Sequence, residues 1–209
     1  MASRSNTHDR DAALNRALAL FWKQGFHATS LKDLEAALGM HPGSIYAAFG
    51  NKESLFRMAL DRYATQMAAE QARIADEAPG ILEGLARFIG GGHPVARGDL
   101  PVPACFLAKT TLDTGVDQPE IRAALHDLLD RSEAAFADRF RAAQAAGELS
   151  PDADPDRLAR RLQVELTGIG FYALRPNRRG AARQMAVDLA DDIRRLGDAG
   201  RPGTTAWLA

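Results

Sequence analysis

The chain has 209 residues, 46% of them hydrophobic, and a net charge of −1 with the histidines neutral. This length and apolar content are sufficient for a buried core, in one large or two small domains. No apolar run approaches the roughly 20 residues of a membrane-spanning helix, and the polar start of the chain has no hydrophobic signal segment. The single cysteine, Cys105, cannot form an internal disulfide, which fits a reducing compartment. We therefore expect a cytoplasmic protein, neither exported nor inserted in a membrane.

The charge distribution is only weakly informative about nucleic acids. Residues 1–60 contain seven Lys and Arg against five Asp and Glu, so this part carries +2 and the remainder −3. This mild bias permits a phosphate-binding surface near the start, although the whole chain lacks the basic excess that many nucleic-acid binders show.

Helical patterns run almost throughout the chain without a convincing alternating strand, so we predict an all-α fold. Apolar residues at helical spacing predict a first helix over residues 11–24, ended by Gly25. A second helix begins near Ser30, whose hydroxyl forms a helix-start signature with the Asp33 carboxylate. One face of this helix carries Leu31, Leu34 and Leu38. Gly39 follows where a left-handed residue would end the helix.

A third helix is predicted directly after a sharp turn. Pro42 suits its first position, because the ring presets φ and the missing N–H would be unpaired there. Ile45 and Phe49 point inward at helical spacing. The opposite face carries Gly43, Ser44, Tyr46 and Ala47. Two short helices joined by a tight turn, with the second presented outward, are the layout of a helix-turn-helix DNA reader.

The rest of the chain is also predicted to be helical. A long helix starts at Asn51 or Lys52 and runs to about Glu77, because Pro79 and Gly80 follow. Further helices are predicted at residues 81–89, 104–114, 119–146, 155–174 and 178–196.

Two late helices carry more apolar surface than one core requires. The helix at residues 155–174 has one stripe of Leu158, Leu162, Leu166, Ile169 and Ala173, and another of Val164, Gly168, Phe171 and Tyr172. The last helix has a stripe of Met185, Leu189, Ile193 and Leu196 beside Ala182, Ala186 and Ala190. One stripe can face the core and another a second copy of the chain, although both can also be buried within one chain. We favour a dimer seam, formed by Leu158, Leu162, Phe171, Ala182, Ala186, Leu189 and Ile193.

Residues 29–56 resemble the N-terminal DNA-binding domain of the tetracycline-repressor (TetR) family of bacterial transcriptional regulators. They read T-S-L-K-D-L-E-A-A-L-G-M-H-P-G-S-I-Y-A-A-F-G-N-K-E-S-L-F, and the specific part is G-x-x-x-G-S-I-Y-x-x-F-x-x-K. The resemblance covers about residues 10–62, and the later helices agree in order. It implies an all-helical homodimer with a helix-turn-helix domain and a ligand-binding and dimerisation domain. The last residues, which include G-D-A-G-R-P-G-T-T-A, indicate a flexible tail. We place these at residues 1–51, 52–197 and 198–209.

The resemblance also places particular residues at double-stranded DNA: Thr29, Pro42, Gly43, Ser44, Tyr46 and Lys52, with Ala47 on the same face. A tyrosine hydroxyl and a lysine ammonium are suitable phosphate donors, and small residues allow close approach. Glu35 stands where such pairs usually have a small apolar residue. Ala47 and Ala48 stand where relatives often carry larger groups, so sequence can instead be read by methyl contacts, backbone position or DNA shape.

A small-molecule site is expected between residues 52 and 146, and this expectation rests on the resemblance. We assign to it Phe88, Cys105, Phe106, Thr110, Leu128 and Phe136, although such stripes are usually core. Few charged groups lie near Cys105 and Phe106 in the sequence, which favours an apolar effector. The expected function is a repressor that a small molecule releases from a palindromic operator.

No catalytic, cofactor-binding or metal-binding constellation is predicted. Residues 168–173 fit G-x-G-x-x-A, but they continue a helical stripe and Pro176 follows, so the strand-turn-helix context of a dinucleotide site is absent. Residues 152–156 imitate a calcium loop, but Arg157 replaces its glycine, so a helix cap is expected. The histidines lack paired metal-ligand spacing, and Cys105 fits a small buried thiol. Two alternatives remain: a helical-bundle enzyme and a non-specific DNA-binding protein.

Overall fold

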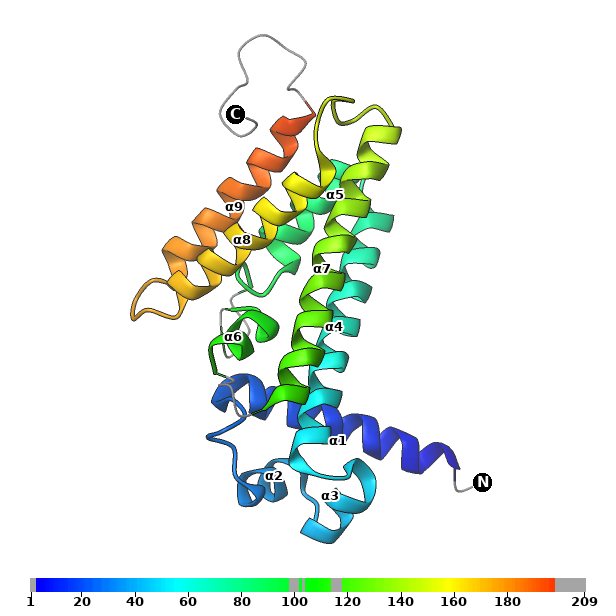
Figure 1. Cartoon of the computed structure of the whole chain (residues 1–209), viewed down its shortest axis with the longest axis vertical. Coiled ribbons are helices and arrows are strands. Elements are labelled where there is room, and N and C mark those ends of the chain that lie inside the picture. Colours follow the sequence, from blue (N-terminus) through cyan, green and yellow to red (C-terminus); the bar gives the residue numbers. More distant parts are fainter. Residues whose placement is uncertain (1–2, 98–101, 103, 114–117, 198–209) are drawn as a thin grey trace. The chain divides into compact units, whose positions relative to one another are not determined.

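The computed structural model describes residues 3–97, 102, 104–113 and 118–197. The chain folds as two compact units, which we call unit 1 (residues 1–66 and 106–128) and unit 2 (residues 67–105 and 129–209). The described residues form helices and no strand, which confirms the predicted all-α class (Figure 1). The helices are α1 (Ser3–Gln24), α2 (Leu31–Leu38), α3 (Pro42–Phe49), α4 (Lys52–Asp76), α5 (Ile81–Arg87), α6 (Phe106–Asp113), α7 (Pro119–Ala145), α8 (Pro155–Ala173) and α9 (Arg179–Leu196).

The helix boundaries follow the predicted ones closely, with two differences. α1 begins at Ser3 rather than Asp11, because residues 3–10 contain neither glycine nor proline to stop it. After α5 the chain continues as a π-helical segment, η1 (Phe88–Gly92), where we expected α-helix to Ile89. A Cβ on Gly92 would lie 2.6 Å from Cδ1 of Ile74, so glycine is what allows this segment to pack so closely.

Aromatic side chains form the centre of unit 1. The ring centroids of Phe21 and Phe56 lie 4.8 Å apart, and those of Trp22 and Tyr63 lie 5.2 Å apart, both edge to face. Phe106 of α6 packs against Phe56 and Tyr63 at 5.6 and 5.8 Å. Such pairs contribute about 0.5–1.5 kcal/mol each beyond the burial of their area. Through these aromatic contacts α1 packs against α4, and α4 packs against α6. α2 packs against α1 and α3.

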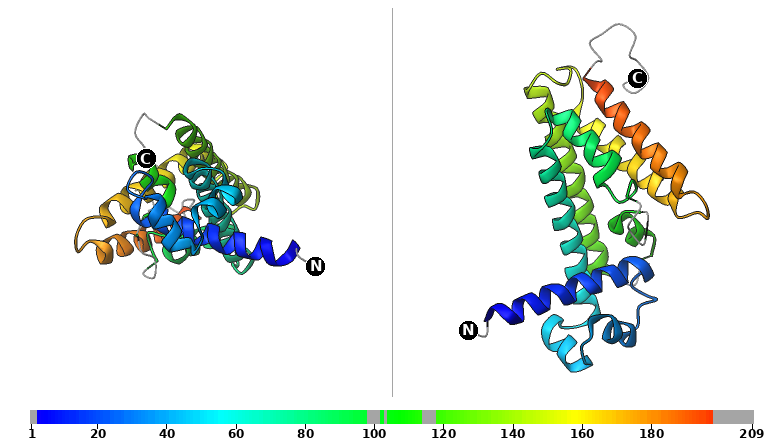
Figure 2. Two further views of the ribbon diagram at one scale, coloured as in Figure 1. Left: turned by 90° about the horizontal axis from the view of Figure 1, so that it is seen from below. Right: turned by 180° about the vertical axis from the view of Figure 1, so that it is seen from behind.

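Unit 2 is organised around α8 and α9, which lie side by side and antiparallel (Figures 1 and 2). α5 and η1 pack against α9, and a Cβ on Gly90 would lie 3.3 Å from the Ala190 methyl group. The Asp154 carboxylate accepts hydrogen bonds from the N–H groups of Asp156 and Arg157 at 3.0 and 3.1 Å. This confirms that residues 152–156 include a helix cap, at the start of α8.

The burial of α8 and α9 corrects the predicted dimer seam. Six of its residues are already buried in the core of the single chain: Leu158, Leu162, Ala182, Ala186, Leu189 and Ile193. The stripe spacing was right, but these residues belong to the stripe that faces the unit's own core. On the opposite face of α8, Val164 and Phe171 remain 70% and 59% exposed.

His93 is a buried core residue, as expected of an isolated histidine. Its Nδ1 accepts a hydrogen bond from the Val95 N–H at 3.3 Å, and its ring meets the Phe88 ring edge to face. Burial lowers the pKa of His93 to about 4, so the ring is neutral at pH 7. Cys105 is only half-buried, less than we expected. Within the described ranges, no group of three or more His, Cys, Asp or Glu is placed to hold a metal, and no helix could span a membrane.

Glu148, in the turn after α7, caps α5 from a distance in the sequence. Its two carboxylate oxygens accept hydrogen bonds from the backbone N–H groups of Ile81 and Leu82, each at 2.9 Å. Gly80, which precedes the helix, offers no side-chain cap, and a Cβ there would lie 2.9 Å from Glu148 Oε1. A carboxylate at this end is also stabilised by the helix dipole. The contact therefore ties α5 to the end of α7.

We expect Glu148→Ala to lower the free energy of unfolding by about 2 kcal/mol, because two N–H groups lose a charged acceptor. Urea denaturation followed by circular dichroism measures this. Glu133 of α7 is a matched control, since its side chain is half-buried like that of Glu148 but its carboxylate has no hydrogen bond or ion pair in the described structure. An equal loss in Glu133→Ala would contradict the capping role.

Candidate nucleic-acid interface

α2 begins with the predicted capping signature. Ser30 Oγ accepts a hydrogen bond from the Asp33 N–H at 3.2 Å, and the Asp33 carboxylate accepts from the Ser30 N–H at 2.8 Å. The Ser30 hydroxyl also donates to that carboxylate at 2.6 Å, and these bonds lower the pKa of Asp33. Gly39 ends the helix in the left-handed region, with φ 66°. The predicted start and end of this helix are therefore confirmed.

α3 presents the face that the sequence predicted. Pro42 occupies its first turn, and Ile45 and Phe49 are buried against the rest of unit 1. The outward residues are Gly43, Ser44, Tyr46 and Ala47, all exposed. Tyr46 is 48% exposed, which leaves its hydroxyl free to reach a phosphate. No atom lies within 4 Å of a Cβ placed on Gly43, so a surface can approach the backbone there.

Two arginines of α1 donate hydrogen bonds to the ends of the short helices α2 and α3. Arg16 Nη2 donates to the Leu38 carbonyl at 2.9 Å, at the end of α2. Arg10 Nε donates to the Ala48 carbonyl at 3.2 Å, and its guanidinium lies 5.3 Å from the centroid of the Phe49 ring. These bonds satisfy carbonyls that a helix end leaves free. Neither arginine was predicted from the sequence, because local spacing does not show contacts between distant segments.

Thr29 corrects one predicted DNA contact. The residue is fully buried, and its hydroxyl donates to the Gly25 carbonyl at 2.7 Å. Because that hydroxyl is already paired inside the unit, it is not available to a phosphate. Thr29 instead fastens the turn between α1 and α2, where Gly25 adopts φ 85°.

Lys52, at the start of α4, is half-buried rather than free in solvent. Its Nζ lies 4.5 Å from the centroid of the Phe26 ring, a cation–π contact. Burial lowers the pKa of Lys52, while the Asp33 carboxylate acts in the opposite direction. The ring therefore fixes where the lysine charge lies. His41 and Lys32 are exposed on the same two-helix segment, and the sequence pattern did not indicate them as DNA contacts.

The residues predicted to line an effector site divide between the two units. Phe106, Thr110 and Leu128 belong to unit 1, and Phe88, Cys105 and Phe136 to unit 2. All are buried except Cys105. Phe106 takes part in the aromatic centre of unit 1, and Phe88 packs against His93. Their role in binding a ligand stays a prediction.

Comparison with known proteins identifies the family. Residues 13–59 match the family described as "Bacterial regulatory proteins, tetR family", and residues 82–191 match "Tetracyclin repressor-like, C-terminal domain". The HTH-type transcriptional repressor ComR of Escherichia coli is 33% identical over 195 residues, which cover 92% of this chain and 90% of ComR. The chain belongs to the TetR family. It is therefore a DNA-binding transcriptional regulator, and α2 and α3 are its helix-turn-helix.

Solved structures of TetR-family regulators share the fold. A cysteine mutant of CifR, complexed with 26bp double-strand operator DNA, is 30% identical, with a TM-score of 0.75 over 88% of this chain and 94% of that chain. A TetR-family regulator from Cytophaga hutchinsonii has a TM-score of 0.80 at 21% identity, covering 94% of this chain and 98% of the other. The second likeness concerns the fold alone.

Proposed function

We propose that this TetR-family chain is a repressor that binds a palindromic operator as a homodimer and leaves it when a small apolar molecule binds. The observation that carries the proposal is the outward face of α3. That face is exposed, and a Cβ placed on Gly43 would meet no neighbouring segment within 4 Å, while Ile45 and Phe49 are buried on the other side of the helix. A helix held in this way is suited to the major groove.

The proposed DNA contacts are those of the predicted set that are accessible. Gly43, Ser44, Tyr46 and Ala47 form the face of α3, and Pro42 is half-buried at its first turn. Lys52 supplies a phosphate contact from the start of α4, and Tyr46 a second one. Gly43 and Ala47 are too small for bidentate hydrogen bonds to bases, so methyl contacts and DNA shape would carry much of the specificity.

The proposed dimer uses the outer face of α8. Val164, Gly168 and Phe171 follow one another at helical spacing there, opposite the buried stripe. A Cβ on Gly168 would meet nothing within 4 Å, so the chain's own packing does not require glycine at this exposed place. A glycine between two exposed apolar residues lets another helix approach closely. Met185 of α9 is a further exposed apolar residue for the same seam.

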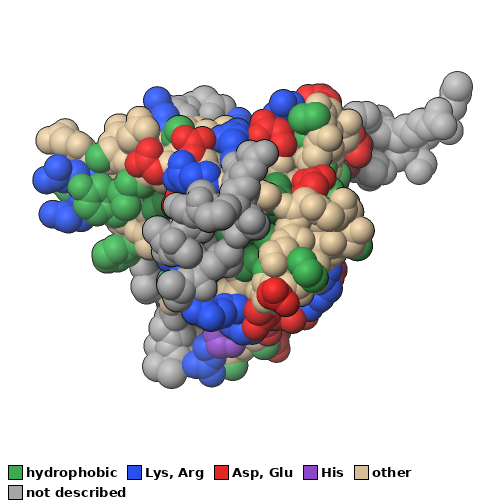
Figure 3. All heavy atoms as spheres, turned by 90° about the horizontal axis from the view of Figure 1, so that it is seen from above, with side chains coloured by type: hydrophobic (Ala, Val, Ile, Leu, Met, Phe, Trp, Pro, Cys, Tyr) green, Lys and Arg blue, Asp and Glu red, His purple; other side chains and the backbone are tan. Residues whose placement is uncertain are grey.

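Exposed apolar side chains also gather where α8 and α9 are joined. Phe171 and Leu174, at the end of α8, are 59% and 41% exposed. Figure 3 shows hydrophobic side chains grouped beside Lys and Arg side chains on the surface of that part of unit 2. A surface of this kind supports a seam with an apolar centre and a basic edge.

The proposed control acts through α4, which begins at Lys52 in unit 1 and ends at Asp76 in unit 2. An effector that favours a different position of this helix would change the spacing of the two reading helices in a dimer, and an operator accepts only matched spacing. By linkage, such an effector binds the DNA-bound dimer less tightly, by the factor with which it weakens DNA binding.

Selection of bound fragments from the source genome tests the function. We expect enrichment of a palindromic site, with much tighter binding than to random DNA of equal length and at equal salt. A ratio near one would favour a non-specific DNA-binding protein. Catalytic turnover without any DNA binding would favour a helical-bundle enzyme.

We expect Lys52→Gln to weaken binding to all DNA sequences by a similar factor, because a phosphate contact carries no sequence information. The slope of log affinity against log salt should fall by about one unit, because the variant neutralises one phosphate fewer. Tyr46→Phe should also weaken binding to all DNA sequences by a similar factor. The salt slope should change less than for Lys52→Gln, because no charge is removed. Fluorescence anisotropy at several salt concentrations measures both, and exposed Lys23 of α1 provides the control Lys23→Gln. An unchanged slope for Lys52→Gln would remove Lys52 from the interface.

A further inference from the structure

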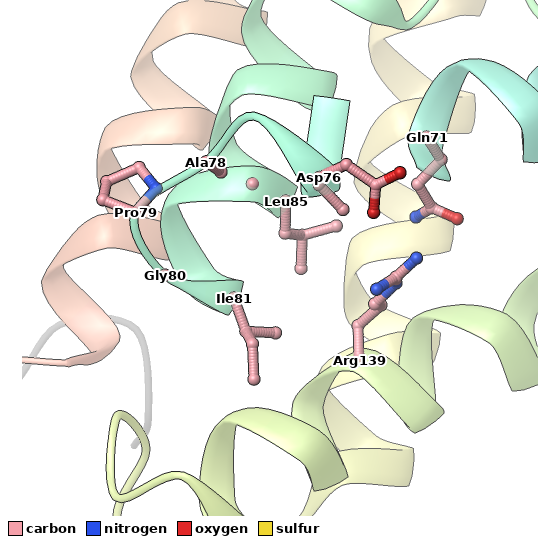
Figure 4. Close-up of a pocket in the computed structure, with 10 residues that line it drawn as sticks. Gln71, Asp76, Ala78, Pro79, Gly80, Ile81, Leu85 and Arg139 are labelled. Atoms are coloured by element: carbon pink, nitrogen blue, oxygen red, sulfur yellow. The ribbon is translucent and has the colours of Figure 1, made fainter. Parts of the chain in front are cut away.

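Unit 2 contains a cavity of about 210 Å³ between the end of α4, the start of α5 and Arg139 of α7 (Figure 4). It lies wholly within unit 2 and shares no residue with the predicted effector site. Its volume is below the roughly 300–1,000 Å³ of pockets for drug-sized molecules, so the cavity suits a smaller ligand.

Three polar side chains line this cavity without partners in the described structure. Gln71 Nε2 is buried and has no hydrogen-bond acceptor. Arg139 of α7 is half-buried and has no ion pair or hydrogen bond, and the same is true of the exposed Asp76 carboxylate. Figure 4 shows the Arg139 guanidinium extending from α7 towards Gln71 and Asp76 on α4. A buried N–H without an acceptor destabilises the protein, so a ligand that accepts a hydrogen bond from Gln71 removes that penalty.

The remaining wall of the cavity is apolar and firmly held. It consists of Ala75, Ala78, Pro79, Ile81, Gly84 and Leu85, with Gly80. A Cβ on Gly84 would lie 3.3 Å from both Ala75 Cα and the Ala78 Cβ, which shows how closely α5 lies against α4. The start of α5 is fixed by its hydrogen bonds to Glu148. The cavity is therefore a formed part of the unit.

We infer that this cavity binds a small zwitterion, an α-amino acid with an apolar side chain. The ligand carboxylate would accept hydrogen bonds from Arg139 and Gln71, and its ammonium group would donate to Asp76. Its side chain would lie on the wall formed by Ile81 and Leu85. A cation and an anion line one cavity without meeting each other, so a molecule that carries both charges bridges them better than one that carries either. Binding at this site does not depend on DNA binding.

Calorimetry with the full chain tests this with L-leucine and two analogues. 4-Methylpentanoate lacks the ammonium group, and L-leucinamide lacks the carboxylate. We expect L-leucine to bind, and each analogue to bind at least 10-fold more weakly, because each leaves one charged side chain unpaired. Equal affinity for all three, or no heat with any of them, would overturn the proposal.

Substitutions identify the cavity as the place of binding. Arg139→Gln and Asp76→Asn should each weaken L-leucine binding at least 10-fold. The control is Arg122→Gln, at a half-buried α7 arginine that has no side-chain partner in the described structure and lies outside the cavity. Equal effects of Arg139→Gln and Arg122→Gln would contradict the proposal.

Gln71→Leu separates binding from folding. It removes the buried N–H, so the thermal midpoint without ligand should stay the same or rise while L-leucine binding is lost. If Arg139 and Asp76 instead closed on each other as an ion pair, Asp76→Asn would lower the midpoint and Gln71→Leu would leave binding unchanged. That pattern would overturn the zwitterion site.

Discussion

The Phe171→Asp variant is expected to be a folded monomer that has lost most of its affinity for the operator. Phe171 is largely exposed in the single chain, so its replacement removes no core contact. In the proposed α8 seam, an unpaired buried carboxylate costs about 3–5 kcal/mol, which corresponds to a dimer dissociation constant raised by roughly 100-fold or more. A monomer reads one half-site only, so operator binding falls with the dimer. Sedimentation velocity and thermal unfolding measure the two properties separately.

Two further variants make this result specific. Ala134→Asp introduces the same charge at an exposed α7 residue and should leave the dimer intact. Leu162→Asp introduces it at a residue with no exposed surface, so it should unfold unit 2 rather than yield a folded monomer. An intact Phe171→Asp dimer at micromolar concentration would rule out this face of α8 as the seam.

Gly43→Asp is expected to weaken specific DNA binding roughly 100-fold without harming the fold. A Cβ at Gly43 has open space around it, and an acidic residue in the first turn of α3 is favoured by the helix dipole. The thermal midpoint should therefore stay the same or rise slightly. On DNA, the carboxylate would face phosphates in each of two copies. A loss of about 1.4 kcal/mol per copy amounts to roughly 100-fold in affinity.

Gly43→Asn is the matched control, because it has nearly the same shape without the charge. It should lose clearly less affinity than Gly43→Asp, and the gap between the two variants should shrink at high salt, where phosphate repulsion is screened. Gly43→Asp with wild-type affinity would mean that this end of α3 does not approach the DNA.

The local structure of the helix-turn-helix was predictable because its signals lie within a few residues of one another. Ser30 and Asp33 are three positions apart, and their reciprocal hydrogen bonds form inside one turn of helix. Gly39 and Pro42 likewise act on their own backbone. Such features depend little on the rest of the fold, so they can be predicted from the local sequence alone.

The predictions that needed correction concern which surface a side chain meets. Helical spacing in α8 separates two stripes correctly, but it does not say which one faces the chain's own core. The structure buries Leu162 and exposes Phe171, which the sequence had placed in one seam. The predicted DNA contact of Thr29 needed correction for a similar reason, because its hydroxyl donates to the carbonyl of Gly25 in the preceding turn.

The zwitterion site was not predictable from local pattern at all. Gln71 and Arg139 come from α4 and α7, far apart in the sequence, and neither belongs to a recognisable motif. The two residues are identified by polar side-chain groups that have no hydrogen-bond partner. A missing partner can be recognised only when the positions of all neighbouring segments are known. Glu148 and the start of α5 show the same dependence on distant contacts.

The hydrogen bonds from α1 to the ends of α2 and α3 also bear on how the reading helices fold. Each of these helices has only eight residues, too short to be stable alone in water. Arg16 and Arg10 of α1 donate hydrogen bonds to carbonyls in their last turns. Each helix also buries its apolar side in the same unit, α2 through Leu34 and Leu38 and α3 through Ile45 and Phe49. The three helices therefore form and melt as one cooperative block. Partial unfolding would therefore not leave α3 folded and bound to DNA without α1 and α2. The fraction of operator that is occupied then depends on the fraction of protein in which all three helices are folded.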